Sequence, residues 1–234
     1  MDGAKGIENR LKTKIIEAKR FVAYFDIMGF KDRVYRNYHE VSNMMYKLDE
    51  FISLMKKLDS RYSTNLKPIV FSDTILFISP SDSPSDLENV LSVCAFFLAD
   101  MIAKKIPIKG AIAHGTFTTD YEKSLYFGLP LIDAYLLTNQ VFFYGALLHN
   151  SIEKYLEEIK NKQSIDNVMK FIARKPIPTK SGLINHSYIS LKFDWSKYSF
   201  EREMLEAFYL DVSGKPRKYV DNSLLVYFPS DEKD

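Results

Sequence analysis

The chain has 234 residues, a net charge of +2 and 46% hydrophobic residues. This composition is typical of a globular protein and excludes a disordered one. The single cysteine, Cys94, excludes a disulfide framework and a multi-cysteine zinc site. The small net charge gives no reason to expect a nucleic-acid partner. The first twenty residues do not resemble a signal peptide, and no apolar run approaches the ~18 residues of a membrane span. We therefore expect a cytoplasmic protein without nucleic-acid or membrane partners.

Hydrophobic periodicity divides the first third of the chain into four elements. A polar lead-in over residues 1–19 precedes a short buried strand, Phe21–Ile27. Apolar residues from Val41 to Leu58 recur at i, i+3, i+4 and i+7, which predicts an amphipathic helix. Ile69–Phe71 and Ile75–Ile78 are two apolar runs separated by three residues, and this spacing predicts a hairpin.

The rest of the chain extends the same alternation. Ser85, followed three residues later by Glu88, forms a capping-box pattern and predicts a helix over 86–104. The further expected elements are strands 107–116 and 118–127, a helical stretch 131–160 broken near Gly145, a strand 188–193, a helix near 200–208 and a strand 224–228. This order predicts an α+β, ferredoxin-like fold in which helices flank a mostly antiparallel sheet. We expect one domain over 20–234, with a C-terminal extension from about residue 164.

Two aspartates stand in otherwise apolar strand segments. Asp26 lies at the end of the first strand, directly before a glycine turn, and Asp73 lies within the predicted hairpin. Aspartate is depleted from strands, and burial of an unpaired charge is unfavourable. A shared divalent-metal site explains both residues, since carboxylate and carbonyl oxygens suit Mg²⁺ or Mn²⁺. We predict two such ions, held by Asp26, Asp73 and the main-chain carbonyl of Ile27. The competing interpretation is structural, with Asp26 as a helix cap or an ion-pair member.

The residues that follow Asp26 are predicted to bind phosphate. Met28, Gly29, Phe30 and Lys31 lead from the strand into a helix, where free N–H groups receive phosphate oxygens. Gly29 permits close approach of the backbone, and Lys31 adds a positive charge. With a metal pair, this arrangement suits displacement at a phosphorus atom. Lys31 is otherwise a solvated surface residue.

Several segments carry a resemblance to a known family when they are taken together and in order. They are Phe25–Phe30, Phe71–Thr74, Lys109–Gly115, Phe127–Tyr135, Lys180–Gly182 and Tyr219–Asn222. In this series the chain resembles the class III nucleotidyl cyclases, and among them the pyrimidine cyclases of the bacterial anti-phage system called Pycsar. The resemblance implies the class III cyclase fold and a homodimer with active sites at its interface.

The resemblance also implies a reaction. Asp26 and Asp73 would hold both metals while the ribose 3′-hydroxyl of a nucleoside triphosphate attacks its own α-phosphate. The products would be pyrophosphate and a 3′,5′-cyclic nucleotide, cyclic UMP or cyclic CMP. In that family the cyclic nucleotide activates a separate effector protein during phage infection.

This chain departs from the adenylyl and guanylyl cyclases at three positions. Those enzymes carry Gly-Asp where this chain has Ser72-Asp73, and an Asn and an Arg where it has Asp133 and Leu137. We expect Lys31 and Lys109 to meet the transition-state charge instead.

The expected nucleotide-binding set is Phe25, Ile27, Met28, Gly29, Phe30, Lys31 and Tyr62, in addition to the catalytic Asp26, Asp73 and Lys109. Tyr62 is the candidate contact to a pyrimidine base, and its hydroxyl favours UTP over CTP. Two alternatives stay open. One is a degenerate cyclase-like domain that binds nucleotide without turnover. The other is a different palm-type enzyme, such as a dinucleotide cyclase or a polymerase-like transferase.

Overall fold

The computed structural model describes residues 16–229 except 63–64, 162–163 and 193–198, and it gives the backbone alone for 58–62. The strands are β1 (Ile16–Ile27), β2 (Lys67–Phe71), β3 (Thr74–Ile78), β4 (Ile108–Asp120), β5 (Leu125–Gly128), β6 (Gly145–Leu148), β7 (Ile172–Thr179) and β8 (Gly182–Ile189). The helices are α2 (Phe30–Arg36), α3 (Tyr38–Tyr62), α4 (Pro84–Ala103), α5 (Leu129–Thr138), α6 (Asn150–Ile159), α7 (Asp166–Met169), α8 (Arg202–Glu206) and α9 (Arg217–Tyr227), with a 3₁₀ turn, η1, at Ala207–Leu210.

One sheet connects all of these strands. Its order is β2-β3-β1-β4-β6-β8-β7, and β5 pairs with β4 beside this path. Every pair is antiparallel except β4 with β6. The predicted α+β class with a mostly antiparallel sheet is therefore confirmed.

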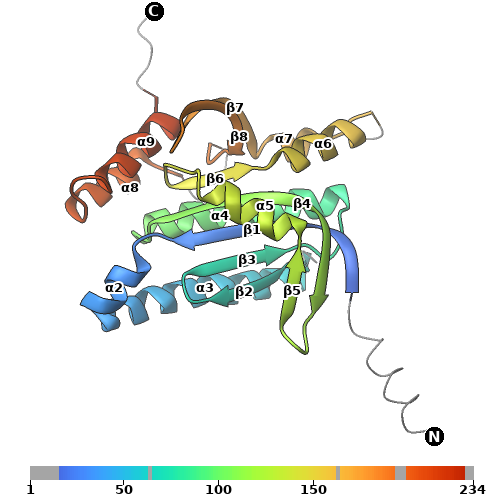
Figure 1. The fold of residues 1–234 in the computed structure, drawn as a ribbon, viewed down its shortest axis with the longest axis horizontal. Helices are drawn as coiled ribbons and strands as arrows, with labels where there is room; N and C mark the ends of the chain where they lie inside the picture. The colour runs from blue at the N-terminus through green and yellow to red at the C-terminus, as the bar shows by residue number, and fades with distance from the viewer. Residues whose placement is uncertain (1–15, 63–64, 162–163, 193–198, 230–234) are drawn as a thin grey trace, which may run out of the picture.

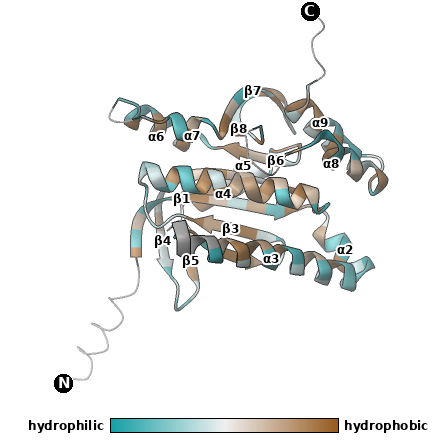
Figure 2. Ribbon diagram, turned by 180° about the vertical axis from the view of Figure 1, so that it is seen from behind, coloured by the Kyte–Doolittle hydropathy of each residue, from teal (hydrophilic) through white to brown (hydrophobic). Residues whose placement is uncertain are grey.

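Helices cover both faces of the sheet (Figures 1 and 2). α3 and α4 lie on one face, and α5 lies across β1 and β4 on the other. β1 alternates between the two faces, as a strand must. Its Phe21, Phe25 and Ile27 join the large core shared with α3 and α4, whereas Val22 and Tyr24 pack with Leu76 and Phe117 on the α5 face. Asp26 continues the series of Val22 and Tyr24, so it belongs to the α5 face.

The order of strands and long helices predicted for the first half of the chain is correct, but the short helix α2 was not predicted as a separate element and several boundaries differ. β1 begins at Ile16, inside the predicted lead-in, whose residues 1–15 lie outside the described ones. α4 begins at Pro84 and its cap is Ser83, not Ser85: the Ser83 hydroxyl accepts from the amide of Asp86 at 3.1 Å. Proline at the first helical position, with its fixed φ and no donor to satisfy, explains this earlier start.

Three later predictions are wrong, and a fourth is only partly right. The two strands predicted at 107–116 and 118–127 are one long strand, β4, followed by the short β5. The helical stretch 131–160 contains a strand, β6, between α5 and α6. The segment 224–228 is not a strand, because it forms the end and the C-cap of α9. The predicted strand 188–193 overlaps only the end of β8, and its partner β7 was missed.

No helix within the described ranges is both long enough and apolar enough to cross a lipid bilayer.

Candidate active site

The two predicted aspartates lie at the same end of the sheet. On β1, Asp26 stands opposite Thr74 of β3 on one side and Lys109 of β4 on the other. Asp73 precedes Thr74 in the tight turn between β2 and β3. The amide of Ile27 donates to the carbonyl of Asp73 at 2.9 Å, so the main chain joins the two aspartate segments directly.

Asp26 and Lys109 form a loose, partly buried pair. The Lys109 Nζ lies 3.9 Å from Asp26 Oδ2 and donates to the carbonyl of Thr138, at the end of α5, at 3.2 Å. Burial raises the pKa of Asp26; Lys109 opposes this effect, and the charge of Asp73 adds to it. Burial likewise lowers the pKa of Lys109, against the attraction of Asp26. Both pKa shifts disfavour the charged forms, because desolvation outweighs the attraction at this distance.

Lys180 is a second cation near Asp26 that our site prediction did not include. It lies in the turn between β7 and β8, and its amide donates to the carbonyl of Gln140 at 3.0 Å. The charge of Lys180 lowers the pKa values of both Asp26 and Lys109. The only sequence signal was that Lys180–Gly182 belongs to the resembling segments, since nothing local links this turn to β1.

The turn after β1 has the geometry that its sequence requires. Gly29 adopts φ +71° just before α2, a left-handed conformation that glycine tolerates best. The amide of Met28 is already used, donating to the carbonyl of Pro107 at 2.8 Å. Phe30 packs partly against the core, and Lys31 is exposed at the start of α2. The phosphate contacts predicted for this turn remain predictions.

Two predicted nucleotide-binding residues are placed differently from expectation. The ring of Phe25 is fully buried on the helix-covered face, at 5.1 Å from the Phe97 ring, so it is a core residue and not a nucleotide contact. Tyr62 ends α3, and β2 then runs its full length before Asp73 is reached. α3 therefore ends at the opposite end of this sheet region from Asp73 (Figure 1), and the structure does not bring Tyr62 to the aspartates. The side chain of Ile27 is also in the core, which leaves only its carbonyl as a candidate ligand.

The residues present fit a small divalent cation. Among the described residues, no group of three or more His, Cys, Asp or Glu side chains is arranged to hold a metal. Mg²⁺ needs only one or two carboxylates when waters and substrate phosphates complete its shell. Asp26 and Asp73 supply two, and the charge of Asp73 works against ionisation of Asp26. A cation between them would remove that repulsion.

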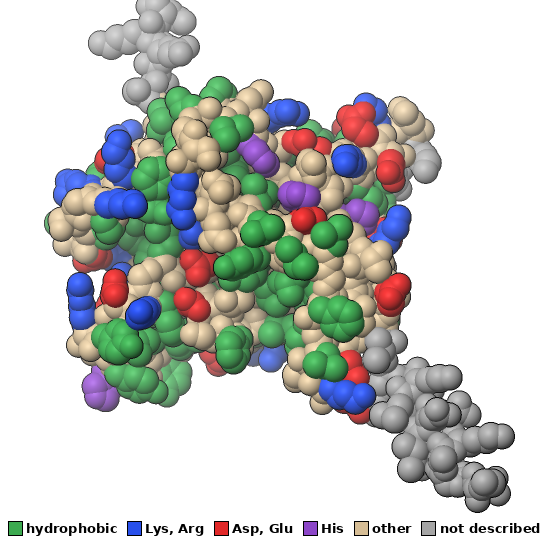
Figure 3. Space-filling view, viewed as in Figure 1, with side chains coloured by type: hydrophobic (Ala, Val, Ile, Leu, Met, Phe, Trp, Pro, Cys, Tyr) green, Lys and Arg blue, Asp and Glu red, His purple; other side chains and the backbone are tan. Residues whose placement is uncertain are grey.

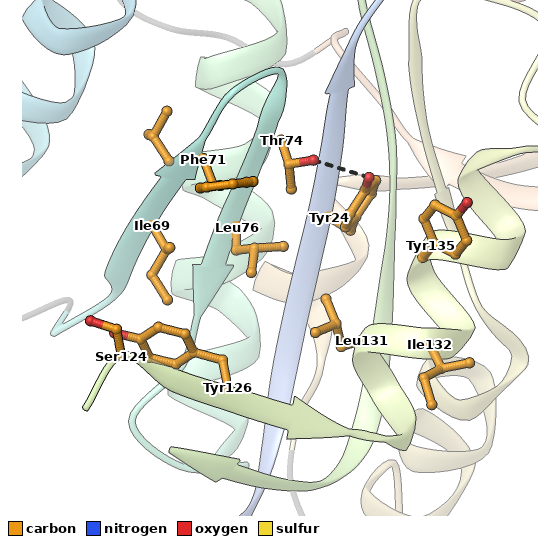
Figure 4. A pocket seen from close by; sticks show the side chains of 11 residues that line it. Tyr24, Ile69, Phe71, Thr74, Leu76, Ser124, Tyr126, Leu131, Ile132 and Tyr135 are labelled. Atoms are coloured by element: carbon orange, nitrogen blue, oxygen red, sulfur yellow. Dashed lines mark hydrogen bonds between the residues drawn. The ribbon is translucent and has the colours of Figure 1, made fainter. Parts of the chain in front are cut away.

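A cavity of about 630 Å³ adjoins the aspartates on the α5 face of the sheet (Figure 4). Its lining residues are Tyr24, Ile69, Val70, Phe71, Thr74, Leu76, Ser124, Tyr126, Leu131, Ile132 and Tyr135. None of them is charged. The Tyr24 hydroxyl lies 3.2 Å from Thr74 Oγ1, and the Tyr135 ring meets the Tyr24 ring edge to face. The cavity thus offers apolar walls and a few hydroxyl groups, which suits a flat, neutral, polar-edged group.

α5 carries Asp133 and Leu137, which the resemblance predicts to stand in place of the Asn and Arg of the purine cyclases. Asp133 Oδ2 lies 3.7 Å from His149 Nδ1, and Leu137 packs partly against the core. At these two positions one side chain therefore faces a histidine and the other is apolar.

The fold matches catalytic domains of known cyclases. The catalytic core of a rhodopsin-guanylyl cyclase with converted specificity, solved in complex with ATPαS, aligns over 76% of this chain and 98% of its own, with 15% identity and a TM-score of 0.51. The guanylyl cyclase Cya2 aligns over 81% of this chain and 100% of its own, with 10% identity and a TM-score of 0.51. No protein-family model and no curated protein matches the sequence. The chain therefore has the class III nucleotidyl cyclase fold.

Proposed function

We propose that this protein is a metal-dependent nucleotidyl cyclase that converts UTP, or less readily CTP, into the 3′,5′-cyclic monophosphate and pyrophosphate. The supporting observation is the main-chain bond from Ile27 to Asp73, which fixes two carboxylate-bearing segments at one end of the sheet, with Lys109 and Lys180 beside them. Of the resembling segments, those that carry Asp26, Asp73 and Lys109 meet at this end of the sheet, whereas Phe127, opposite Thr118, lies towards the other end of β4. The two structural neighbours, a cyclase with ATPαS bound and a guanylyl cyclase, support the same chemistry.

In the proposed reaction the 3′-hydroxyl gives its proton to solvent water and its oxygen bonds to the α-phosphorus, while the bond from that phosphorus to the α,β-bridging oxygen breaks and pyrophosphate leaves. Divalent ions held by Asp26 and Asp73 would favour the 3′-alkoxide and neutralise charge on the phosphates. Lys109 and Lys180 would stabilise negative charge that accumulates on the departing pyrophosphate. The turn Met28–Lys31 would bind the phosphate chain, with Gly29 allowing its close approach.

The uncharged cavity supports a nucleobase as its occupant, and the choice of a pyrimidine follows from the resemblance. Its hydroxyl groups on Tyr24 and Thr74 can donate to a base carbonyl or accept from an exocyclic amine. We assign the base to this cavity in place of Tyr62. We further propose, from the resemblance, that the cyclic product is a messenger for a separate anti-phage effector.

We propose that the protein acts as a homodimer. Hydrophobic side chains gather in the middle of the face formed by α5 and β5 (Figure 3). On α5, Leu129, Ile132 and Leu136 are 62%, 55% and 56% exposed, and Phe127 of β5 is 59% exposed. The α5 residues are spaced i, i+3 and i+7, so they form one stripe. Exposed apolar patches of this kind mark interaction sites, and a second copy would also cover the mouth of the cavity.

The second candidate function is nucleotide binding without turnover. It is favoured by α5, where Asp133 and Leu137 replace the groups that act on the transition state in purine cyclases.

One experiment separates these functions. Purified protein is incubated with each of the four ribonucleoside triphosphates and Mn²⁺ or Mg²⁺, and the products are separated by chromatography. We expect cyclic UMP as the main product, none with EDTA, and a loss of at least ~10³-fold in Asp26→Asn and Asp73→Asn. Asp32→Asn, an exposed carboxylate on α2, is the matched control. Tight binding with no product supports the binding-only function, and linear or dimeric nucleotides support a different palm-type enzyme.

A further inference from the structure

The C-terminal helix α9 is hydrogen-bonded to the loop 139–144, which leads into β6 beside Lys109. The Asn222 side-chain amide donates to the carbonyl of Phe142 at 2.7 Å. The Ser223 hydroxyl accepts from the amide of Tyr144 at 2.8 Å and donates to the carbonyl of Tyr219 at 2.6 Å. The loop over 139–144 and α9 are therefore one rigid unit on this side of the sheet.

This unit fixes the ring of Tyr219. The ring meets Phe142 edge to face, with 4.7 Å between centroids, and stacks on Tyr144 at 6.1 Å. Tyr144 is followed by Gly145, which stands opposite Lys109, and Lys109 stands opposite Asp26. Since neighbouring strands are ~4.8 Å apart, Tyr219 packs on a segment about two strand spacings from Asp26.

The hydroxyl of Tyr219 is the unusual feature. The residue is only 8% exposed, yet within the described ranges its hydroxyl has no hydrogen-bond partner. It is also not among the side-chain atoms that are both unpartnered and sealed from solvent, unlike the hydroxyl of Tyr227 on the same helix. A buried phenol usually finds a partner. Because it is not sealed, the Tyr219 hydroxyl can be reached from outside the protein, and it lies close enough to Asp26 to feel the charge of that carboxylate.

The charge of Asp26 acts on this hydroxyl. Burial raises the pKa of Tyr219, and the negative charge of Asp26 raises it further, so the phenol keeps its proton at neutral pH. A protonated phenol at this end of the sheet, which also carries Lys109 and Lys180, can donate a hydrogen bond to an anion. The main-chain amide of Lys180 donates to the carbonyl of Gln140 in the same loop.

We infer that Tyr219 donates a hydrogen bond to the β- or γ-phosphate of the substrate, and so brings the C-terminal helix into the active site. The distal phosphates are chosen because Asp26, two strand spacings away, is assigned to the reacting end. This inference rests on the proposed function for the identity of the ligand, but its test measures binding and not turnover.

The test compares Tyr219→Phe with Tyr227→Phe, which removes a sealed hydroxyl from the same helix. Calorimetry with Mg²⁺ measures the affinity for α,β-methylene UTP and CTP, which cannot lose pyrophosphate, and for UMP and CMP, which lack the distal phosphates. We expect Tyr219→Phe to bind the favoured triphosphate analogue about tenfold more weakly and the monophosphates as wild type does. Tyr227→Phe should match wild type for every ligand.

The outcomes separate the two proposals. Unchanged analogue binding by Tyr219→Phe, equal weakening for analogue and monophosphate, or no analogue binding by wild type each overturns the inference. If Tyr219→Phe weakens only the analogues while wild type yields no cyclic product from any triphosphate, the inference stands and the cyclase proposal fails. If wild type makes cyclic product and Tyr219→Phe binds normally, the inference alone fails.

Discussion

The Nζ of Lys109 lies 3.9 Å from Oδ2 of Asp26, across the pair of central strands that carries the proposed active site. At that separation neither charge offsets the desolvation of the other: the pKa of Asp26 is raised and that of Lys109 is lowered. Both groups would therefore be stabilised in their charged forms by further charges, such as those of a bound divalent cation and of substrate phosphates. Such sites reduce the stability of the protein alone in favour of ligand binding.

We predict that Asp26→Asn stabilises the metal-free protein at pH 7. Because the folded-state pKa of Asp26 is raised, its favourable contribution is complete below the unfolded-state pKa of about 3.9 and is lost as pH rises through the folded-state value. Because asparagine does not ionise, the Asp26→Asn variant does not lose stability as the pH rises. Urea unfolding in EDTA should therefore show a stability gain at pH 7 that disappears near pH 3.5.

The control for this prediction is Asp32→Asn, in the first turn of α2, where loss of an exposed carboxylate near the helix start should give no gain. A lower stability of Asp26→Asn at pH 7 would show instead that attraction to Lys109 dominates, contrary to our interpretation.

Ser72 provides a second prediction, about strain. It adopts φ +56°, in the left-handed region, in the turn just before Asp73. A residue other than glycine is destabilised by about 1–2 kcal/mol in this conformation. Glycine avoids this strain, but it loses more conformational entropy on folding, and this loss offsets part of the gain. Ser72→Gly should stabilise the fold by about 0.5–1 kcal/mol, a rise in Tm of about 1–4 °C, and keep the activity. Ser72→Ala, which keeps a Cβ, should not; equal melting temperatures for the two variants would contradict a strained turn.

The cavity gives a third prediction, on substrate choice. Tyr24→Phe combined with Thr74→Val removes both hydroxyls of the pair beside Asp26 and keeps the apolar volume. Since a site that hydrogen-bonds its substrate rejects analogues strongly, the double variant should lose about tenfold in kcat/KM for the favoured pyrimidine triphosphate and discriminate less among the four. Tyr121→Phe, outside the cavity, is the control. Unchanged selectivity among the four triphosphates would show that the base does not bind in this cavity.

Part of the site could be predicted because its chemistry is local. Asp26 and Asp73 are conspicuous in apolar strands, and the hairpin that carries Asp73 is a short-range pattern. The structure brings their segments together through the bond from Ile27 to Asp73. The contributions of Lys180 and Tyr219 depend on long-range packing around the loop 139–144, which no periodicity in one sequence reveals.

The fold errors have the same cause. β4 was expected to break near Phe117, yet it pairs with β1 without interruption from Ile108 to Thr119, and this pairing overrides the local break. β6 is four buried residues long, too short an apolar run to distinguish from a helix. The segment 224–228 is apolar enough for a strand, but the side chain of Lys175 donates to the carbonyls of Leu225 and Val226 at the end of a helix.

The last prediction concerns the exposed stripe on α5. Replacing Leu129 and Leu136 together by Asp, which leaves the cavity-lining Ile132 in place, puts charges in the proposed dimer interface, where desolvation is unfavourable. By sedimentation at micromolar concentration we expect a wild-type dimer, a monomeric double variant with unchanged far-UV circular dichroism, and at least ~100-fold lower activity, because each site would need both subunits. Leu210→Asp, at an 86% exposed apolar residue on η1, should remain dimeric and active. An active wild-type monomer would refute the proposed dimer. A dimeric double variant would show that the dimer interface lies on another face of the protein.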